Sequence, residues 1–255
     1  MRNSLDQISL HVFLYYEDIG VYLLEKLAKV WRGKINLSLA KDNVANTTLL
    51  YKANELFSTV VVSYVEHPSS DQVGFIQSVK NDTEHTDYIL YLHDKHLSKK
   101  EWLDAITHPL LMNLGVMEDD VGIVSSVSHK NKVLTMEEIK RAHLMISHKD
   151  RANVVRLMQT VLWLQELQDQ FATRYRGYDD NPDHLFPEFT AGTSFLIRRK
   201  VVEAVHGCIH PDFFEDYRPD GNVDHAIERF YYYVSLALGY KNLFVDNEPK
   251  QTHPS

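Results

Sequence analysis

The chain has 255 residues, 44% of them hydrophobic, which is enough to bury a sizeable core in one large domain or two small ones. Its formal net charge is -8 at pH 7, with Lys and Arg interspersed among carboxylates. This charge argues against broad binding to nucleic acids or anionic membranes, which requires basic patches.

The first half of the chain alternates between strand-like and helix-like segments. The apolar run Ile8–Tyr16 predicts a strand, and the apolar spacing over Asp18–Trp31 predicts a helix. Such an alternation predicts a mostly parallel sheet with helices on both faces. The expected strands are 8–16, 35–39, 59–65, 88–92 and 121–124, and the expected helices are 18–31, 47–57, 72–80 and 98–113.

The second half has a different pattern. A long charged stretch without Pro or Gly predicts one or two helices, and the turn-rich segment after it predicts a loop beside a site. Further strands and helices follow to the end of the chain. In order, the expected elements are helix 136–174, loop 177–187, strand 190–197, helices 198–205 and 223–238, and strand 243–245.

Cys208 is the only cysteine, which excludes a disulfide within the chain and is consistent with a reducing compartment. The apolar run near the N-terminus is too short, and too closely followed by acidic residues, for a signal peptide or a membrane span. We therefore expect a cytoplasmic protein with no transmembrane segment.

The strand predicted at 88–92 ends abruptly in four polar residues, His93, Asp94, Lys95 and His96. In open α/β sheets, ligands bind outside the carboxyl ends of the strands. A group of titratable side chains at such an end is therefore a candidate binding site.

Five segments, in this order, resemble the rhamnan synthesis protein F family of bacterial polysaccharide glycosyltransferases. His93 and Lys95 match the family's His-x-Lys motif, and a later segment matches its Asp-Gly followed by His-Ala-x-Glu-Arg. The resemblance spans most of the chain. The segments are LHVFLYYEDIGVYLLEKL, SSDQVGF, YLHDKH with a following Trp, FTAGTSFLIRR and DGNVDHAIER.

The chain also resembles the acceptor half of GT-A glycosyltransferases, in the segment FLIRRKVVEAV, the acidic segment that follows it, and LGYKN. This resemblance implies a single GT-A-like α/β domain over 1–255, with a nucleotide-sugar-binding half at 1–125 and an acceptor half at 126–255. It implies sugar transfer from a nucleotide sugar to a polysaccharide or other glycan. The resemblance also implies inversion, with Asp220 as the general base.

The same fold commonly uses an Asp-x-Asp motif to hold a divalent metal, whereas this chain has His93-Asp94-Lys95 at that place. Dependence on manganese or magnesium therefore stays open, with Asp94 and His253 as candidate ligands. Lys95, with His93 if protonated, would supply positive charge to the diphosphate directly. The alternative is that these side chains only solvate a loop.

The remaining expected site residues divide between the two substrates. In the donor site we place Tyr15, Asp71 and Gly74, although packing and helix capping are alternative roles for such residues. Thr193 and Ser194 are expected to contact the acceptor or donor sugar. His225 and Glu228 lie three residues apart, so they share a helix face on which they flank the base or bind a metal together. A salt-linked helix surface is the alternative for this pair.

Two other functions stay open at this stage. The missing Asp-x-Asp is consistent with a non-catalytic module of the same fold that binds a glycan or a nucleotide. A metal-dependent hydrolase using His93, Asp94 and His96 with His225 is less favoured, because closely spaced ligands on an irregular segment give poor metal geometry. The oligomeric state and the identity of the sugar are not predicted.

Overall fold

The computed structural model describes residues 5–66, 71–95, 100–128, 130–131, 189–190, 192–207, 209, 227–228, 231–232, 234–236 and 238–247. The helix predicted over 136–174 and the loop predicted over 177–187 lie outside these residues. Within them, strands and helices alternate along the first half of the chain. The α/β class expected from the sequence is therefore confirmed.

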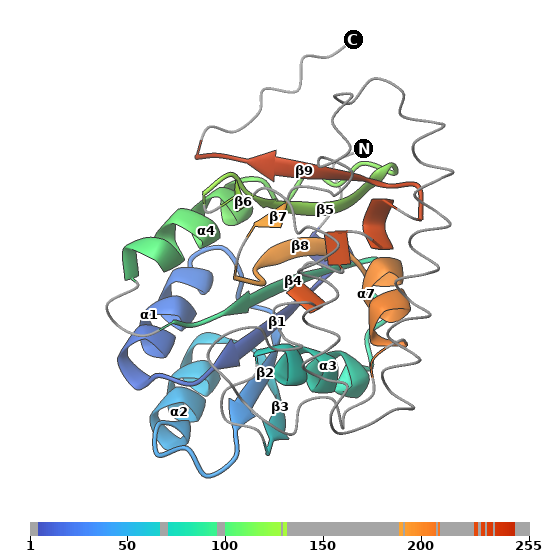
Figure 1. Cartoon of the computed structure of the whole chain (residues 1–255). Helices are drawn as coiled ribbons and strands as arrows, with labels where there is room; N and C mark the ends of the chain where they lie inside the picture. Colours follow the sequence, from blue (N-terminus) through green and yellow to red (C-terminus); the bar gives the residue numbers. More distant parts are fainter. Residues whose placement is uncertain are drawn as a thin grey trace, which may run out of the picture.

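A seven-stranded mixed sheet forms the centre of the molecule (Figure 1). β8 is antiparallel to its neighbours β4 and β5, and the other described pairs in this sheet are parallel. The expected mostly parallel sheet is confirmed. Its order is β3 (Thr59–Val65), β2 (Lys34–Ala40), β1 (Ile8–Leu14), β4 (Tyr88–His93), β8 (Phe195–Arg198), β5 (Val121–Ser126) and β9 (Lys241–Val245).

The order of the first four strands sets the position of a site. Successive strands add on one side of β1 until β3, and β4 then adds on the other side of β1. This reversal makes the gap between β1 and β4 a topological switch point, where open α/β sheets bind ligands at the carboxyl ends of the strands.

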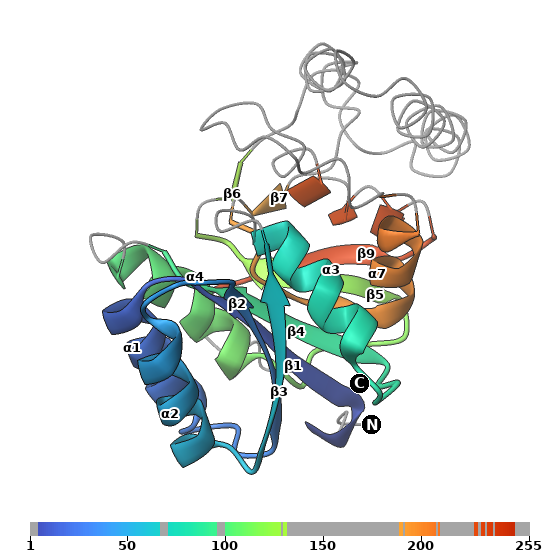
Figure 2. The ribbon, with the colours of Figure 1, turned by 90° about the horizontal axis from the view of Figure 1, so that it is seen from below.

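Helices cover both faces of the sheet, as the sequence predicts (Figure 2). Side chains alternate between the faces of β1, so that Leu10 and Val12 join one core and Phe13 joins the other. Among the described residues, no helix is long and apolar enough to cross a membrane. One face carries α1 (Glu17–Leu27), α2 (Asn46–Leu56) and α4 (Lys100–Met112), and the other carries α3 (Asp71–Asn81) and α7 (Arg199–His206).

The strand predicted over 190–197 is wrong, because a turn divides it into two. β7 (Phe189–Thr190) pairs with β6 (Lys130–Asn131) in a small second sheet, and β8 starts only at Phe195. Between them the backbone takes positive φ at Gly192 (100°) and Thr193 (29°). Such angles lie outside the β region, so a strand cannot continue through this turn.

A buried network of charged and polar groups lies at the amino ends of β1 and β2, away from the predicted site. The guanidinium of Arg199 donates to Asp82 Oδ2 at 2.7 Å and to the Thr86 carbonyl at 2.6 Å. Lys34 Nζ donates to the other oxygen of Asp82 at 3.0 Å, and His11 lies 3.5 Å from this carboxylate. Burial alone would raise the pKa of Asp82, but hydrogen bonds from His11, Arg199 and Lys34 outweigh it and lower the pKa.

Candidate functional site

Three chain segments meet at the edge of the sheet where β1 and β4 end. β8 is antiparallel to β4, so the residues just before β8 lie at the end of β4. Asp71 is the first residue of α3, and its carboxylate contacts His93. The start of α3 therefore lies at the same edge. The fold therefore brings together residues that the sequence analysis selected from positions more than one hundred residues apart.

Asp94 connects the end of β4 to the start of α1. Its Oδ2 accepts hydrogen bonds from the backbone N–H groups of Tyr15 (2.9 Å) and Tyr16 (2.8 Å). Its Oδ1 is buried and has no hydrogen-bond partner among the described residues. Burial raises the pKa of Asp94 to about 7, against the opposing effect of the two N–H groups and of the charge on Lys95. The carboxyl group is thus held in place by one oxygen, and the other oxygen has hydrogen-bonding capacity to spare.

His93 is buried, and carbonyl oxygens face both of its ring nitrogens. Nε2 lies 2.7 Å from the Gly192 carbonyl, and Nδ1 lies 3.0 Å from the Asp94 carbonyl. The Asp71 carboxylate is 3.8 Å from Nε2. Burial lowers the pKa of His93, while the charge of Asp71 raises it. A neutral ring can donate to only one of the two carbonyls, and neither nitrogen offers an open lone pair to a metal.

Lys95 follows directly and is partly exposed. Its ammonium lies 5.3 Å from the ring centroid of Trp102, within the range of a cation–π contact. The same ring meets His93 edge to face at a centroid distance of 6.0 Å. Trp102 also covers Gly192 so closely that a Cβ at that position would collide with the indole. Trp102 thus forms an apolar wall beside the cation.

The start of α3 contributes Asp71 and Gln72. The Asp71 carbonyl accepts a hydrogen bond from the Tyr91 hydroxyl at 2.6 Å, which ties the helix to β4. Gln72 is buried and donates from Nε2 to the Thr193 hydroxyl at 2.6 Å. Its Oε1, like the hydroxyl of Ser194, is buried with no hydrogen-bond partner among the described residues. Unpaired groups of this kind are uncommon in folded proteins and require an explanation.

The turn before β8 is fixed by the carboxylate of Glu228. Glu228 lies in the helical residues 227–228, and its Oε1 accepts the N–H groups of both Gly192 and Thr193, the latter at 3.2 Å. Thr193, Ser194 and Glu228 are all buried. Two successive N–H groups that point at one anion form the concave arrangement that binds anions elsewhere. Here a side chain of the same protein provides the anion.

Two predicted donor residues have packing contacts of their own. A Cβ on Gly74 would collide with the ring of Phe13, so glycine allows α3 to lie close against β1. The Gly74 carbonyl also accepts a hydrogen bond from Ser38 at 2.7 Å. Tyr15 is partly buried, and its ring meets Tyr16 edge to face at 5.0 Å. Donor contacts for both residues stay predictions.

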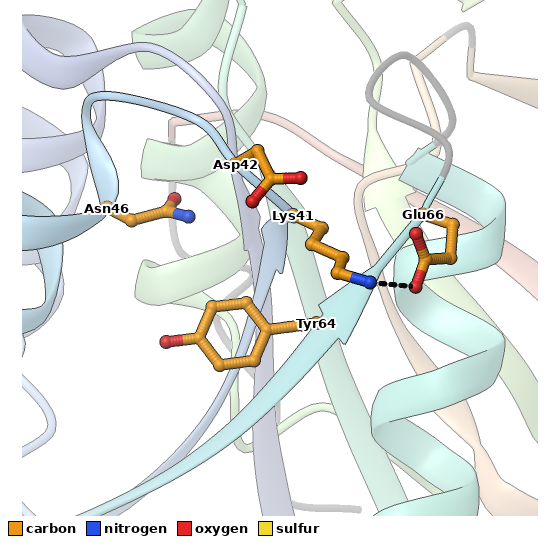
Figure 3. A pocket seen from close by; sticks show the side chains of 5 residues that line it. All are labelled: Lys41, Asp42, Asn46, Tyr64 and Glu66. Carbon is orange, nitrogen blue, oxygen red and sulfur yellow. Dashed lines mark hydrogen bonds and ion pairs between the residues drawn. The ribbon is translucent and has the colours of Figure 1, made fainter.

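An open hollow of about 520 Å³ lies at the carboxyl ends of β2 and β3 (Figure 3). The ring of Tyr64, about half exposed, forms one wall. An ion pair of 2.7 Å between Lys41 and Glu66 forms another. The loop at this hollow also reaches the switch point, because Asn43 donates a hydrogen bond to the Tyr15 carbonyl. The lining residues are Lys41, Asp42, Asn46, Tyr64 and Glu66.

The described residues do not form a metal site by themselves. Nowhere among them do three or more His, Cys, Asp or Glu side chains gather in a way that would hold a metal ion. Asp94 offers one unpaired carboxylate oxygen, and His93 has carbonyl groups at both ring nitrogens. A single oxygen is far fewer than the ligands that manganese or magnesium requires.

The other predicted site residues lie outside the described part of the chain, namely Asp220, His225, His253 and His96. Gln72 and Gly192 were missed by the sequence analysis. A glycine within a strand-like run indicates a bulge or a close approach of the backbone, and this signal at Gly192 would have identified the turn. Gln72 has no such signal, because its contact with Thr193 spans 121 positions.

Comparisons of the chain with protein-family models, with curated proteins and with solved structures found no match. Any functional interpretation therefore depends on the geometry of the site and on the resemblance of the sequence segments.

Proposed function

We propose that the protein is a glycosyltransferase that moves a sugar from a nucleotide sugar to a polysaccharide or other glycan acceptor. In this proposal the chain is one GT-A-like domain of the rhamnan synthesis protein F type, acting in the cytoplasm. The donor binds between the ends of β1 and β4. The acceptor approaches from the side of Thr193 and Ser194.

One observation carries the proposal. Segments selected from the sequence for sugar transfer, around Asp71, His93 to Lys95, Thr193 and Glu228, meet through direct contacts at the topological switch point. Nothing in the local sequence requires residues so far apart to lie together. Their convergence at the edge where α/β sheets bind ligands supports a common role.

The distribution of groups at this edge suits a nucleotide diphosphate with a sugar attached. Lys95 is partly exposed, and its ammonium would act as a point charge for phosphate. Three buried polar groups have no hydrogen-bond partner among the described residues and would suit sugar hydroxyls, namely Asp94 Oδ1, Gln72 Oε1 and the Ser194 hydroxyl. The hollow beside Tyr64 has an exposed aromatic ring on which a nucleobase would stack.

The proposed reaction is a direct displacement at the anomeric carbon of the donor sugar. Asp220 takes the proton from an acceptor hydroxyl as its oxygen forms the new bond to that carbon. The bond from the anomeric carbon to the diphosphate oxygen breaks at the same time, and its electron pair leaves with the nucleotide. Lys95 stabilises the negative charge that develops on this leaving group.

Replacement of Asp220 by asparagine should lower the transfer rate by at least about 100-fold, because an amide does not accept the acceptor's proton. Donor binding should stay near that of the wild type. The measurement is release of nucleoside diphosphate in the presence of a glycan acceptor, with donor affinity determined separately. The neighbouring Asp224→Asn provides a matched control that should keep most of the activity. Equal turnover in wild type and Asp220→Asn would remove Asp220 from the mechanism.

A non-catalytic module of the same fold is the second candidate. Asp94, at the place of a metal-binding motif, is held by two backbone N–H groups, and the described residues contain no group of three or more metal-ligating side chains. Such an arrangement is consistent with binding that has lost turnover. Wild-type protein that binds a nucleotide sugar selectively, yet neither hydrolyses it nor transfers its sugar to any glycan offered, would favour this module.

A further inference from the structure

The carboxylate of Glu228 binds the backbone of a turn with positive φ angles. Its Oε1 accepts the N–H groups of Gly192 and Thr193, in the turn where both residues have positive φ. For threonine this conformation is costly, so the contacts around it must stabilise it. A buried carboxylate that accepts two N–H groups is well suited to this purpose.

This turn also fixes the positions of two side chains of the candidate site, those of His93 and Thr193. The Gly192 carbonyl contacts His93 Nε2 at 2.7 Å, and the Thr193 hydroxyl accepts from Gln72 at 2.6 Å. The ring of Trp102 packs against Gly192. The hydrogen bonds from Gly192 and Thr193 to Glu228 therefore connect Glu228 to the site through the backbone of this turn.

We propose that Glu228 is a positioning residue, whose carboxylate fixes the Gly192–Thr193 turn and through it the places of His93 and Thr193. This role differs from flanking the general base or binding a metal together with His225, which the sequence alone suggested for Glu228. Which parts of a bound substrate His93 and Thr193 contact depends on the proposed function. The link from Glu228 to the turn rests only on the contacts above.

Hydrogen exchange of individual backbone amides tests the link directly. In Glu228→Ala, the amides of Gly192 and Thr193 should exchange at least about tenfold faster, because both lose a hydrogen bond to a charged group. In Glu228→Gln, the side-chain oxygen can still accept both bonds, so most of the protection should return. Glu228→Asp, which keeps the charge but is one methylene shorter, should resemble Glu228→Ala.

The ring ¹⁵N chemical shifts of His93 give a second readout. They should move in Glu228→Ala and return toward the wild-type values in Glu228→Gln, because the Gly192 carbonyl faces Nε2. A merely stabilising role for Glu228 would leave them unchanged. Glu203→Ala, on the exposed side of α7, is the matched control and should alter neither readout.

The exchange of Val12, buried in β1, separates a local effect from general destabilisation. Faster exchange confined to Gly192 and Thr193 supports the positioning role. Unchanged rates at these two amides, or equal acceleration at Val12, would overturn it. If the wild type binds no nucleotide, the proposed function fails, whereas the exchange experiment still decides the role of Glu228.

Discussion

Replacement of Arg199 by methionine is expected to lower the free energy of unfolding by about 3–5 kcal/mol, the usual cost of removing one partner from a buried ion pair. Arg199 is 7% exposed and donates to the carboxylate of Asp82, whose side chain is fully buried. It also donates to the Thr86 and Glu84 carbonyls. Methionine fills much of the volume but donates no hydrogen bond to these acceptors. Lys34 alone would then neutralise Asp82.

The neighbouring Arg198 provides a matched control for this experiment. Arg198 lies over the rings of Tyr88 and Tyr240, at centroid distances of 5.0 and 4.8 Å, and donates to backbone carbonyls. It is partly exposed, and it pairs with no buried carboxylate within the described part of the chain. Arg198→Met should therefore cost only about 1 kcal/mol. Urea unfolding of both variants measures the difference. Losses of similar size would contradict the role given to the buried pair.

Replacement of Asp94 by asparagine is expected to change the pH dependence of stability. The pKa of Asp94 in the folded protein is about 7, against 3.8 for an exposed carboxyl group. Between these values the folded protein keeps a proton that the unfolded chain has lost, so Asp94 makes the wild type progressively less stable as pH rises from about 4 to 7. With about 1.4 kcal/mol for each pKa unit, the total is on the order of 4 kcal/mol.

The Asp94→Asn variant has no carboxyl group that titrates at this position. Its free energy of unfolding relative to that of the wild type should therefore increase from pH 4 to 7 and stay constant above pH 7. Asparagine also keeps an oxygen for the N–H groups of Tyr15 and Tyr16. Denaturant unfolding of both proteins at several pH values measures the difference, in which the contributions of other titrating groups cancel. Parallel pH profiles for the two proteins would show that the pKa of Asp94 is not raised.

Asp82 should change the stability with pH in the opposite direction to Asp94, and in a lower pH range. Its pKa is lowered in the folded protein, so its contribution to stability is present above about pH 4, the ordinary value for an aspartate, and is lost as pH falls below it. The two aspartates thus give opposite slopes, because Asp82 has basic partners. At Asp94 burial dominates, and Oδ1 has no hydrogen-bond partner among the described residues.

The secondary structure of the first half could be predicted because its signals are local. β3 has the predicted bounds Thr59–Val65, since a run of β-branched residues indicates a strand without reference to the rest of the chain. β1 ends at Leu14, two residues before the predicted end. The N–H groups of Tyr15 and Tyr16 bind Asp94 instead of continuing the sheet. Backbone donors are the same in every sequence, so this contact has no local signal.

The candidate site was predictable in part for the same reason. Polar residues after an apolar strand indicated His93 and Lys95, but not what they would contact. The turn at Gly192 depends on Glu228, and the pairing of Asp82 with Arg199 spans 117 positions. Such contacts depend on the strand order, which periodicity alone does not specify. Sequence patterns thus indicated candidate residues, and the fold was needed to bring them together.

The most direct test of the proposed donor site is a thermal-shift screen against nucleoside diphosphates and nucleotide sugars, each with and without manganese. Ligands that bind the folded state raise its unfolding temperature. We expect a selective shift for the wild type that does not require manganese and is much smaller for Lys95→Ala. Lys29→Ala, an exposed lysine just after α1, should behave as the wild type. No shift with any nucleotide, or equal shifts with and without the Lys95 ammonium, would contradict the proposed donor site.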